Sequence, residues 1–255
     1  MPQAEPKVYV YGVLPGADAP NVAVGGVEQA QVRTVEHAGL AALVSTLEGN
    51  ELAAAREVRA HWRVLEDASK SATVLPVRFG TVLEGDGAVR ERLLEPNAER
   101  LGEMLDALAG RVQLNVSGDY DEERVLREVV QSSPQVAALR DRVSRLSDSA
   151  GYYDRIRLGE LVAAQIAARR EQDAAHATAR LEPFAVSVRA DEISSPNGAF
   201  KLAFLVEGGE VDGFSEAVGV LREELADRVT LTYVGPLPPY SFAETDLSAG
   251  TAAWA

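Results

Sequence analysis

The sequence contains no cysteine. Disulfide cross-links, a thiol nucleophile and a cysteine-based zinc site are therefore excluded. Histidine is almost as scarce, because only His37, His61 and His176 are present. The three lie far apart in the sequence, and none has a second histidine or an acid at the spacing of a metal site. His61 lies on the apolar side of a predicted helix beside Trp62, which is typical of a core histidine with one hydrogen bond. We therefore expect no metal and no cofactor.

Catalytic motifs are also missing. The sequence has no Gly-x-x-x-x-Gly-Lys-Ser/Thr phosphate loop and no Gly-x-Ser-x-Gly nucleophile elbow. The acidic run at 119–123 lacks the turn glycine of a calcium loop, since Arg124 occupies that place. We predict that the protein is not an enzyme and has no catalytic, cofactor-binding or metal-binding residue. Two alternatives stay open: an enzyme with an unrecognised site, and a module that senses a small molecule.

Positive charge is in deficit. The sequence has 25 Lys and Arg against 39 Asp and Glu, a net charge of −14. Phosphate backbones and anionic bilayers both attract basic surfaces, so we expect no nucleic-acid partner and no membrane partner. No apolar run approaches the roughly 20 residues that span a bilayer, and the start of the sequence does not resemble a signal peptide. The expected location is the cytoplasm.

The 255 residues, 46% of them hydrophobic, are enough for two modest domains. In the first half, alternating and β-branched runs predict strands, while apolar positions spaced three and four apart predict helices. The predicted strands are residues 7–13, 32–36, 40–45, 73–82 and 111–116, and the predicted helices are residues 51–70, 88–94 and 96–108. The strands at 32–36 and 40–45 form a hairpin at Ala38-Gly39. Pro76 favours an edge or a bulge for the strand at 73–82.

The second half opens with helices and closes with strands. Asp121 and Ser133-Pro134 are helix-start signals, and Gly151 precedes a long helix from Tyr152 to Arg180. Strands are then predicted at residues 183–190 and 199–206, followed by a helix at 212–227 and a strand from Val229. Helix and strand orders in both halves are compatible with ferredoxin-like sandwiches. We place the boundary at Ser117 to Tyr120.

The last strand leads into a stiff, proline-rich arm. Gly235 and Pro236 are predicted to end the strand, and Pro238 and Pro239 to hold the chain extended. In an extended chain Tyr240 and Phe242 point to the same side. The arm either closes its own core or also shapes a surface for another protein.

Three blocks of the sequence resemble the GvpL/GvpF family of gas vesicle accessory proteins. The first is Val-Tyr-Val-Tyr-Gly-Val at 8–13, and the second is Val-Leu-Pro-Val-Arg-Phe-Gly-Thr-Val at 74–82. The third is Gly-Pro-Leu-Pro-Pro-Tyr-Ser-Phe at 235–242. They occur in the family's order and span nearly the whole chain. Many members carry tryptophan where this sequence has Leu237. The resemblance does not separate the L-type from the F-type paralogue.

The resemblance implies a non-enzymatic assembly factor that binds the major shell protein of the gas vesicle and other accessory proteins. It implies an α+β fold of two domains, each a modified ferredoxin-like sheet-and-helix sandwich, the second with an added helical segment. We assign residues 1–118 and 119–244 to these domains and residues 245–255 to a mobile tail. The residues that we expect to act as interaction or anchor positions are Pro76, Arg78, Phe79, Pro238, Pro239, Tyr240 and Phe242.

Arg78 has two interpretations, because it is a charge between Val77 and Phe79 in an apolar run. Its side chain either points to solvent or to an acid such as Glu84, or it pins the arm or the two domains together. A buried charge without a partner would cost several kcal/mol. The sequence does not choose between them.

Overall fold

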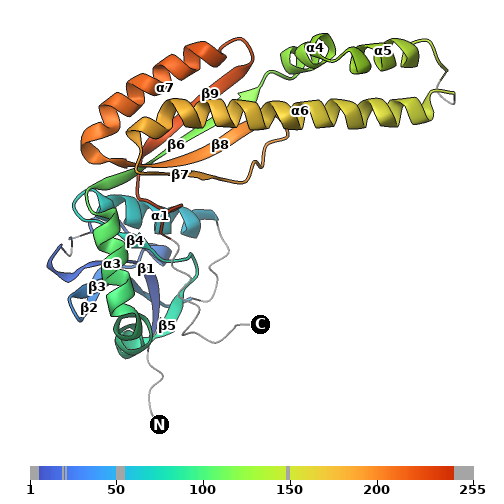
Figure 1. Cartoon of the computed structure of the whole chain (residues 1–255). Helices are drawn as coiled ribbons and strands as arrows, with labels where there is room; N and C mark the ends of the chain where they lie inside the picture. The colour runs from blue at the N-terminus through green and yellow to red at the C-terminus, as the bar shows by residue number, and fades with distance from the viewer. Residues whose placement is uncertain (1–5, 19, 21, 50–54, 148–149, 244–255) are drawn as a thin grey trace. The chain divides into compact units, whose positions relative to one another are not determined.

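The structure is a computed structural model that describes residues 6–18, 20, 22–49, 55–147 and 150–243 (Figure 1). The chain folds into two compact units. Unit 1 comprises the described residues of Met1–Gln113 and Pro236–Ala255, and unit 2 is Leu114–Gly235. The predicted tail at 245–255 lies outside the described residues.

Unit 1 is built on an antiparallel sheet in the order β2-β3-β1-β4, with β5 also paired to β1. Its strands are β1 (Lys7–Pro15), β2 (Arg33–His37), β3 (Leu40–Leu47), β4 (Leu75–Pro76) and β5 (Val82–Glu84). The predicted hairpin is confirmed, since His37 pairs with Leu40 across the two-residue turn. Ala38 and Gly39 both have left-handed backbone angles, with φ of 50° and 79°, as this tight turn requires.

The predicted strand at 73–82 is wrong as a continuous element. Pro76 pairs with Gly12 on β1, and the chain rejoins β1 where Val82 pairs with Tyr9. Between these points the chain turns, with Gly80 at φ +89°. The break follows from the residues, because proline has no N–H for a ladder and glycine tolerates the left-handed turn. The edge position expected from Pro76 is confirmed.

Both faces of this sheet are covered. Tyr9, Tyr11 and Leu43 form one core cluster with Val64 and Leu65, which belong to helix α1 (Ala55–Ser69). On the other face Val10 pairs with Val44, and both are fully buried. The segments that contact β1 and β3 from there are α2 (Gly85–Ala88), the π-helical η3 (Val89–Leu94) and α3 (Ala98–Leu108). Short 3-10 turns complete the unit at η1 (Gly16–Asp18), η2 (Val27–Gln29) and η4 (Glu95–Asn97).

The strand β6 (Arg111–Tyr120) is longer than the predicted strand at 111–116. It runs without interruption through Ser117 to Tyr120, where the sequence suggested a boundary. The passage from unit 1 to unit 2 falls at Gln113 and Leu114, inside this strand. The chain returns to unit 1 at Pro236, near the end of β9 (Val229–Leu237).

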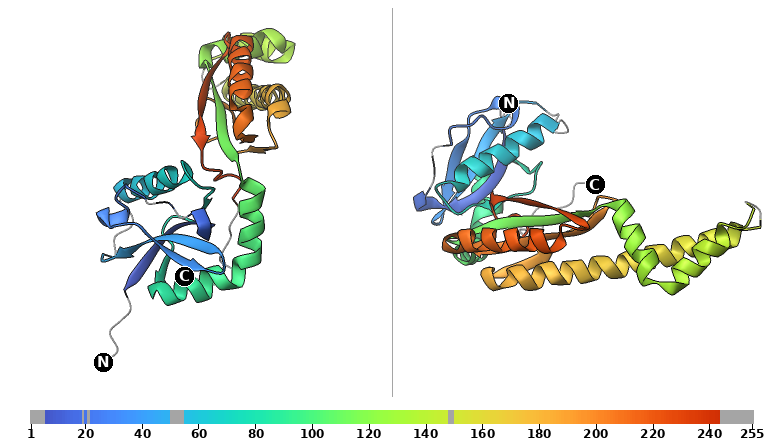
Figure 2. Two further views of the ribbon diagram at one scale, coloured as in Figure 1. Left: turned by 90° about the vertical axis from the view of Figure 1, so that its left-hand side faces the viewer. Right: turned by 90° about the horizontal axis from the view of Figure 1, so that it is seen from above.

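Unit 2 has an antiparallel sheet in the order β7-β8-β6-β9, and helices α6 and α7 lie along one of its faces (Figures 1 and 2). The remaining elements are β7 (Ser187–Ala190), β8 (Gly198–Glu207), α7 (Val211–Leu225) and the 3-10 turns η5 (Glu182–Phe184) and η6 (Gly208–Glu210). Phe204 of β8 packs edge-on against Phe214 of α7, with ring centroids 5.1 Å apart. The predicted strand at 183–190 is shorter than expected, because its start forms η5.

The helices at the start of unit 2 follow the predicted signals closely. The side chain of Asp121 accepts the Arg124 backbone N–H at 3.0 Å and caps α4 (Glu122–Ser132). Ser133 caps α5 (Pro134–Val143) by accepting the Val136 backbone N–H. The long helix α6 (Tyr152–Leu181) is also confirmed. Its first half packs beside α4 and α5 and extends beyond the end of the sheet (Figure 1).

The prediction that Gly235 and Pro236 end the last strand is wrong, since β9 continues to Leu237. β9 is an edge strand of its sheet. A proline is tolerated there because the missing N–H can face away from the neighbouring strand. No helix within the described ranges is both long enough and apolar enough to cross a bilayer.

Candidate functional site

The segment after β9 is a turn rather than an extended arm. The Tyr240 N–H donates to the Pro238 carbonyl at 2.8 Å, and the N–H groups of Phe242 and Ala243 both donate to the Pro239 carbonyl. The expectation of an extended chain, in which Tyr240 and Phe242 would point to the same side, is therefore wrong. The two prolines fix the backbone before the turn but do not extend it. Pro238 and Pro239 are buried, and Tyr240 and Phe242 are half-buried.

The Tyr240 ring is anchored on unit 1. It meets Trp62 of α1 edge-on, with ring centroids 4.2 Å apart and ring planes at 88°. It also packs against the core cluster that contains Tyr9 and Val64. Burial, and to a lesser extent the negative charge of Glu66, raise the pKa of Tyr240 above its usual value. The phenol is therefore neutral at physiological pH, and the ring acts as a packing group.

Gln113, a residue of unit 1 at the start of β6, holds the turn in place. The Oε1 atom of Gln113 accepts the Ser241 backbone N–H at 2.8 Å, and its Nε2 donates to the Ser241 hydroxyl at 3.1 Å. Gln113 is a buried polar residue on β6. Because both ends of its amide are engaged by one residue, the amide sets the position of the whole turn. The sequence carries no pattern that singles out Gln113, and it was not predicted.

His61 lies beside Trp62 on α1, with ring centroids 5.7 Å apart. It is 1% exposed, and its Nδ1 lies 2.9 Å from the Tyr9 hydroxyl. That hydroxyl accepts the Gly80 backbone N–H at 3.1 Å, so its own proton is free for His61 Nδ1. Burial lowers the pKa of His61 to about 4, against an opposing hydrogen bond with the Val77 backbone. The imidazole is neutral, in keeping with the core role predicted for it.

The residues of the second sequence block border the same place. Phe79 is half-buried and meets the rings of Tyr9 and His61 at centroid distances of 6.1 and 5.6 Å. Pro76 is half-buried on β4. Arg78 is exposed, so the interpretation in which its side chain reaches solvent is the one that the structure supports. Its carbonyl accepts the N–H and the hydroxyl of Thr81 within the turn.

Trp62, Phe79 and Tyr240, which are linked by ring contacts through His61 and with each other, together with their sequence neighbours Arg63 and Arg78, are called the Trp62 surface. Trp62 is 42% exposed, and Arg63 and Arg78 are exposed. Neither arginine forms an ion pair with any residue that the structure describes. Trp, Tyr and Arg are the side chains that most often carry the energy of protein–protein contacts. Its groups suit binding of a protein surface with apolar and acidic character.

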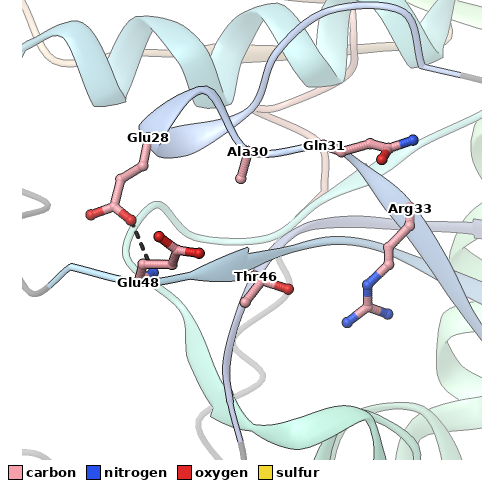
Figure 3. Close-up of a pocket in the computed structure, with 6 residues that line it drawn as sticks. All are labelled: Glu28, Ala30, Gln31, Arg33, Thr46 and Glu48. Carbon is pink, nitrogen blue, oxygen red and sulfur yellow. Dashed lines mark hydrogen bonds between the residues drawn. The ribbon is translucent and has the colours of Figure 1, made fainter.

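A separate cleft of about 510 Å³ lies beside β2 and β3 (Figure 3). Its lining is polar, comprising Glu28, Ala30, Gln31, Arg33, Thr46 and Glu48. Two of the three charged side chains, Glu28 and Arg33, already have partners in the protein. The Glu28 carboxylate accepts the backbone N–H groups of Glu48 and Gly49 at 3.0 Å each. Arg33 binds Asp86 through both terminal nitrogens. Glu48 is the remaining charged group of the lining, and a single carboxylate does not by itself define a ligand site.

Unit 2 contains a buried polar network with a structural role. Arg228 Nη2 donates to Asp173 at 2.5 Å, and the Tyr120 hydroxyl donates to the other carboxylate oxygen at 2.9 Å. The Asp173 side chain is almost fully buried. The hydrogen bond with Asp173, and then its charge, raise the pKa of Arg228, while burial, followed by Asp173, raises the pKa of Tyr120. Among the described residues no group of His, Asp or Glu side chains could hold a metal ion.

The sequence predicted Phe79, Tyr240 and Phe242 as anchors. It missed Trp62, which packs against Tyr240, and Gln113, which binds Ser241. Trp62 falls on the predicted apolar side of its helix and is nevertheless exposed. The signal that was available is the amphipathic spacing, which puts Trp62 beside His61 at the margin of the buried side. The spacing within a helix gives no information on Tyr240, which packs against Trp62 from a distant part of the sequence.

Comparison with known proteins defines the class. The fold is a mixed α and β structure with two antiparallel sheets, and it is shared with crystal structures of gas vesicle proteins. GvpF from Anabaena sp. PCC7120 aligns with a TM-score of 0.79 and 25% identity, covering 94% of this chain and 97% of that one. GvpF from Microcystis aeruginosa aligns with a TM-score of 0.78 and 24% identity, covering 93% and 99% of the two chains.

The family model for gas vesicle synthesis protein GvpL/GvpF matches residues 7–244. Gas vesicle protein F of Streptomyces sp. (strain CB03234) is 35% identical over 244 residues, which is 93% of this chain and 100% of that protein. Gas vesicle protein F of Dolichospermum flosaquae is 24% identical over 242 residues, covering 94% of this chain and 98% of that protein. The chain belongs to the GvpL/GvpF family of gas vesicle proteins, as the three sequence blocks predicted.

Proposed function

We propose that this protein binds the major shell protein of the gas vesicle and assists its assembly without catalysing a reaction. Membership of the family supports a role in gas vesicle formation. The observation that carries the finer proposal is the Trp62 surface, where Trp62 and Tyr240 are locked together while Trp62 stays exposed. An aromatic group held rigid before binding loses little entropy when a partner arrives.

Charge adds to this proposal. The chain has a net charge of −14, which opposes non-specific aggregation of the protein. Arg63 follows Trp62 in α1 and Arg78 precedes Phe79, and both are exposed positive charges, with one acid, Glu66, near Tyr240. We propose that the partner presents apolar side chains to Trp62 and carboxylates to the two arginines. Other gas vesicle accessory proteins are the further partners that we expect, and the cytoplasm and the vesicle are the expected locations.

The architecture belongs to the same proposal. We regard each unit as a modified ferredoxin-like domain, the second enlarged by α4, α5 and the first half of α6. The order β-β-α-β in β7, β8, α7 and β9 supports this for unit 2. Pro76, Pro238, Pro239 and Phe242 then serve as anchors that hold the surface in shape. Arg78, Phe79 and Tyr240 contribute to the surface itself.

Co-expression of the full-length chain with the major shell protein tests the proposal. Trp62→Ser and Arg78→Glu are each expected to lower co-purification of the shell protein at least fivefold. Arg78→Glu, at an exposed position, should leave the melting curve unchanged, whereas Trp62→Ser also loses the ring contact with Tyr240 and should melt at a lower temperature while remaining folded. Arg92→Glu is the matched control, because it makes the same charge reversal at another exposed position of unit 1. If both test variants, stably folded, retain the shell protein as well as Arg92→Glu does, the surface has been placed wrongly.

A further inference from the structure

Among the residues that the structure describes, none packs on one side of the first half of α6. Helices α4 and α5 pack on its other side, and none of the residues from Tyr152 to Gln172 is fully buried. Tyr153 is 82% exposed and Ile156 is 46% exposed. The part that extends beyond the sheet is visible in Figure 1. A helix of this length with an aromatic and an aliphatic group in solvent presents a candidate docking surface.

The exposed side is continuous over most of the helix. Positions that recur at spacings of four and three lie on one side of an α-helix. Starting at Tyr153, such positions are all exposed. We call this set the α6 stripe, and its members are Tyr153, Arg157, Glu160, Ala164, Ala168, Glu171 and Ala175.

The α6 stripe is complementary to itself in the antiparallel direction. If two copies of α6 cross with Ala164 facing Ala164, then Tyr153 of each copy faces Ala175 of the other. Arg157 faces Glu171 in the same arrangement. The large ring of Tyr153 therefore packs on the methyl group of Ala175. The twofold symmetry gives two Arg157–Glu171 pairs, one on each side of Ala164. The alanine at the centre lets the two backbones approach closely.

A parallel arrangement of the same two helices lacks this complementarity. It would set Arg157 against Arg157 and Glu171 against Glu171, and like charges in contact repel. Arg157 and Glu171 also form no ion pair with the rest of the described chain. Their charges are therefore available for a second copy, and their order along the helix selects one direction.

We propose that the α6 stripe docks a second copy of this chain, with the two α6 helices antiparallel and a twofold axis beside Ala164. Such a contact is isologous, since each copy uses the same residues. One pair of helices makes a small interface, below the size of typical permanent complexes. The dimer is accordingly weak, with a dissociation constant of about 10–100 μM.

Sedimentation equilibrium of the purified full-length chain is the direct test, up to about ten times the expected dissociation constant. The wild type is expected to form dimers reversibly. Ala164→Arg is expected to remain monomeric, because it sets two positive charges against each other at the twofold axis. Arginine is a good helix former, so the variant keeps the helix. Ala138→Arg, at an exposed position of α5, is the matched control and should dimerise normally.

A charge exchange then tests the direction. Arg157→Glu and Glu171→Arg should each weaken dimerisation at least threefold, and the double variant should restore it. A wild type that stays monomeric overturns the proposal, as does an Ala164→Arg variant that dimerises like the control. Failure of the double variant to recover rules out the antiparallel register. If Ala164→Arg instead loses only the shell protein, the stripe serves a different partner and the proposal is wrong.

Discussion

Trp62 and Tyr240 come from the two separate stretches of sequence that make unit 1, and their rings meet edge-on with centroids 4.2 Å apart. The contact ties the turn after β9 to helix α1. Gln113 holds the same turn through Ser241. The returning segment is therefore part of the packing of unit 1, and its side chains should contribute measurably to stability.

Tyr240→Ala is expected to lower the free energy of unfolding by about 2 kcal/mol. Truncating a fully buried aromatic costs about 3–5 kcal/mol, and Tyr240 is half-buried. Tyr152→Ala is the control at an exposed tyrosine, where the expected change is within about 0.5 kcal/mol. Urea unfolding monitored by circular dichroism measures both, at concentrations too low for dimers. Equal effects of the two substitutions would mean that the turn is not anchored.

Gly12→Ala is expected to destabilise unit 1 by about 1–3 kcal/mol. A Cβ atom at Gly12 would lie 2.8 Å from the Leu75 carbonyl oxygen and 2.8 Å from Leu65 Cδ2. The first is a backbone atom, which cannot move aside without shifting β4. Gly102→Ala in α3 has no atom within 4 Å of the added methyl group, and alanine should stabilise that helix by up to about 1 kcal/mol. Thermal melts of both variants should move in opposite directions.

Stability should fall as the pH is lowered from about 6.5 to about 4. His61 has a folded pKa of about 4, whereas an unfolded histidine has a pKa of about 6.5. Between these values the unfolded chain binds the extra proton, so lower pH favours unfolding. Above pH 6.5 the contribution is constant. The shift corresponds to about 3 kcal/mol, which is an order-of-magnitude figure.

His61→Gln isolates this contribution from the carboxylates that also titrate at low pH. The difference in unfolding free energy between wild type and variant should shrink as the pH falls from 6.5 to 4. A difference that stays constant over this range would show that His61 protonates equally in both states.

Asp173→Asn should destabilise unit 2 by about 3–5 kcal/mol, because it leaves Arg228 in a partly buried site without its counter-charge. Replacing both residues, as in Asp173→Asn with Arg228→Met, should cost less than the sum of the two single changes. A double-mutant cycle from chemical unfolding measures this coupling. Strict additivity would show that the two charges do not interact in the folded protein.

Local signals in the sequence predicted much of the fold. The Ala38-Gly39 turn, the Asp121 and Ser133 caps and the long α6 helix each depend on residues close together in the chain, and each is confirmed. The turn at Tyr240 was not predicted, because its shape depends on Gln113 and Trp62. Contacts between residues so far apart in the sequence leave no pattern in the residues around Tyr240.

The break between β4 and β5 was not predicted, because it too depends on contacts between residues far apart in the sequence. The apolar run at 73–82 looks continuous, but its register is set by β1, which it meets at Gly12 and again at Tyr9. The candidate site was predicted in part, since Phe79 and Tyr240 stand out as anchors. Trp62 was recognised only as a member of a helix side. Its exposure depends on how far the neighbouring turn covers it.

Unit 2 interrupts unit 1, since the chain leaves at Gln113 and returns at Pro236. A ribosome makes all of unit 2 before it makes Tyr240 and Ser241. Domains generally fold as units during synthesis, in order of emergence. Here the second unit can fold before the first is complete. Until Tyr240 and Ser241 are made, Trp62 and Gln113 lack their contacts with the turn. Completion of unit 1 thus becomes a late event, timed by translation of the last part of the chain.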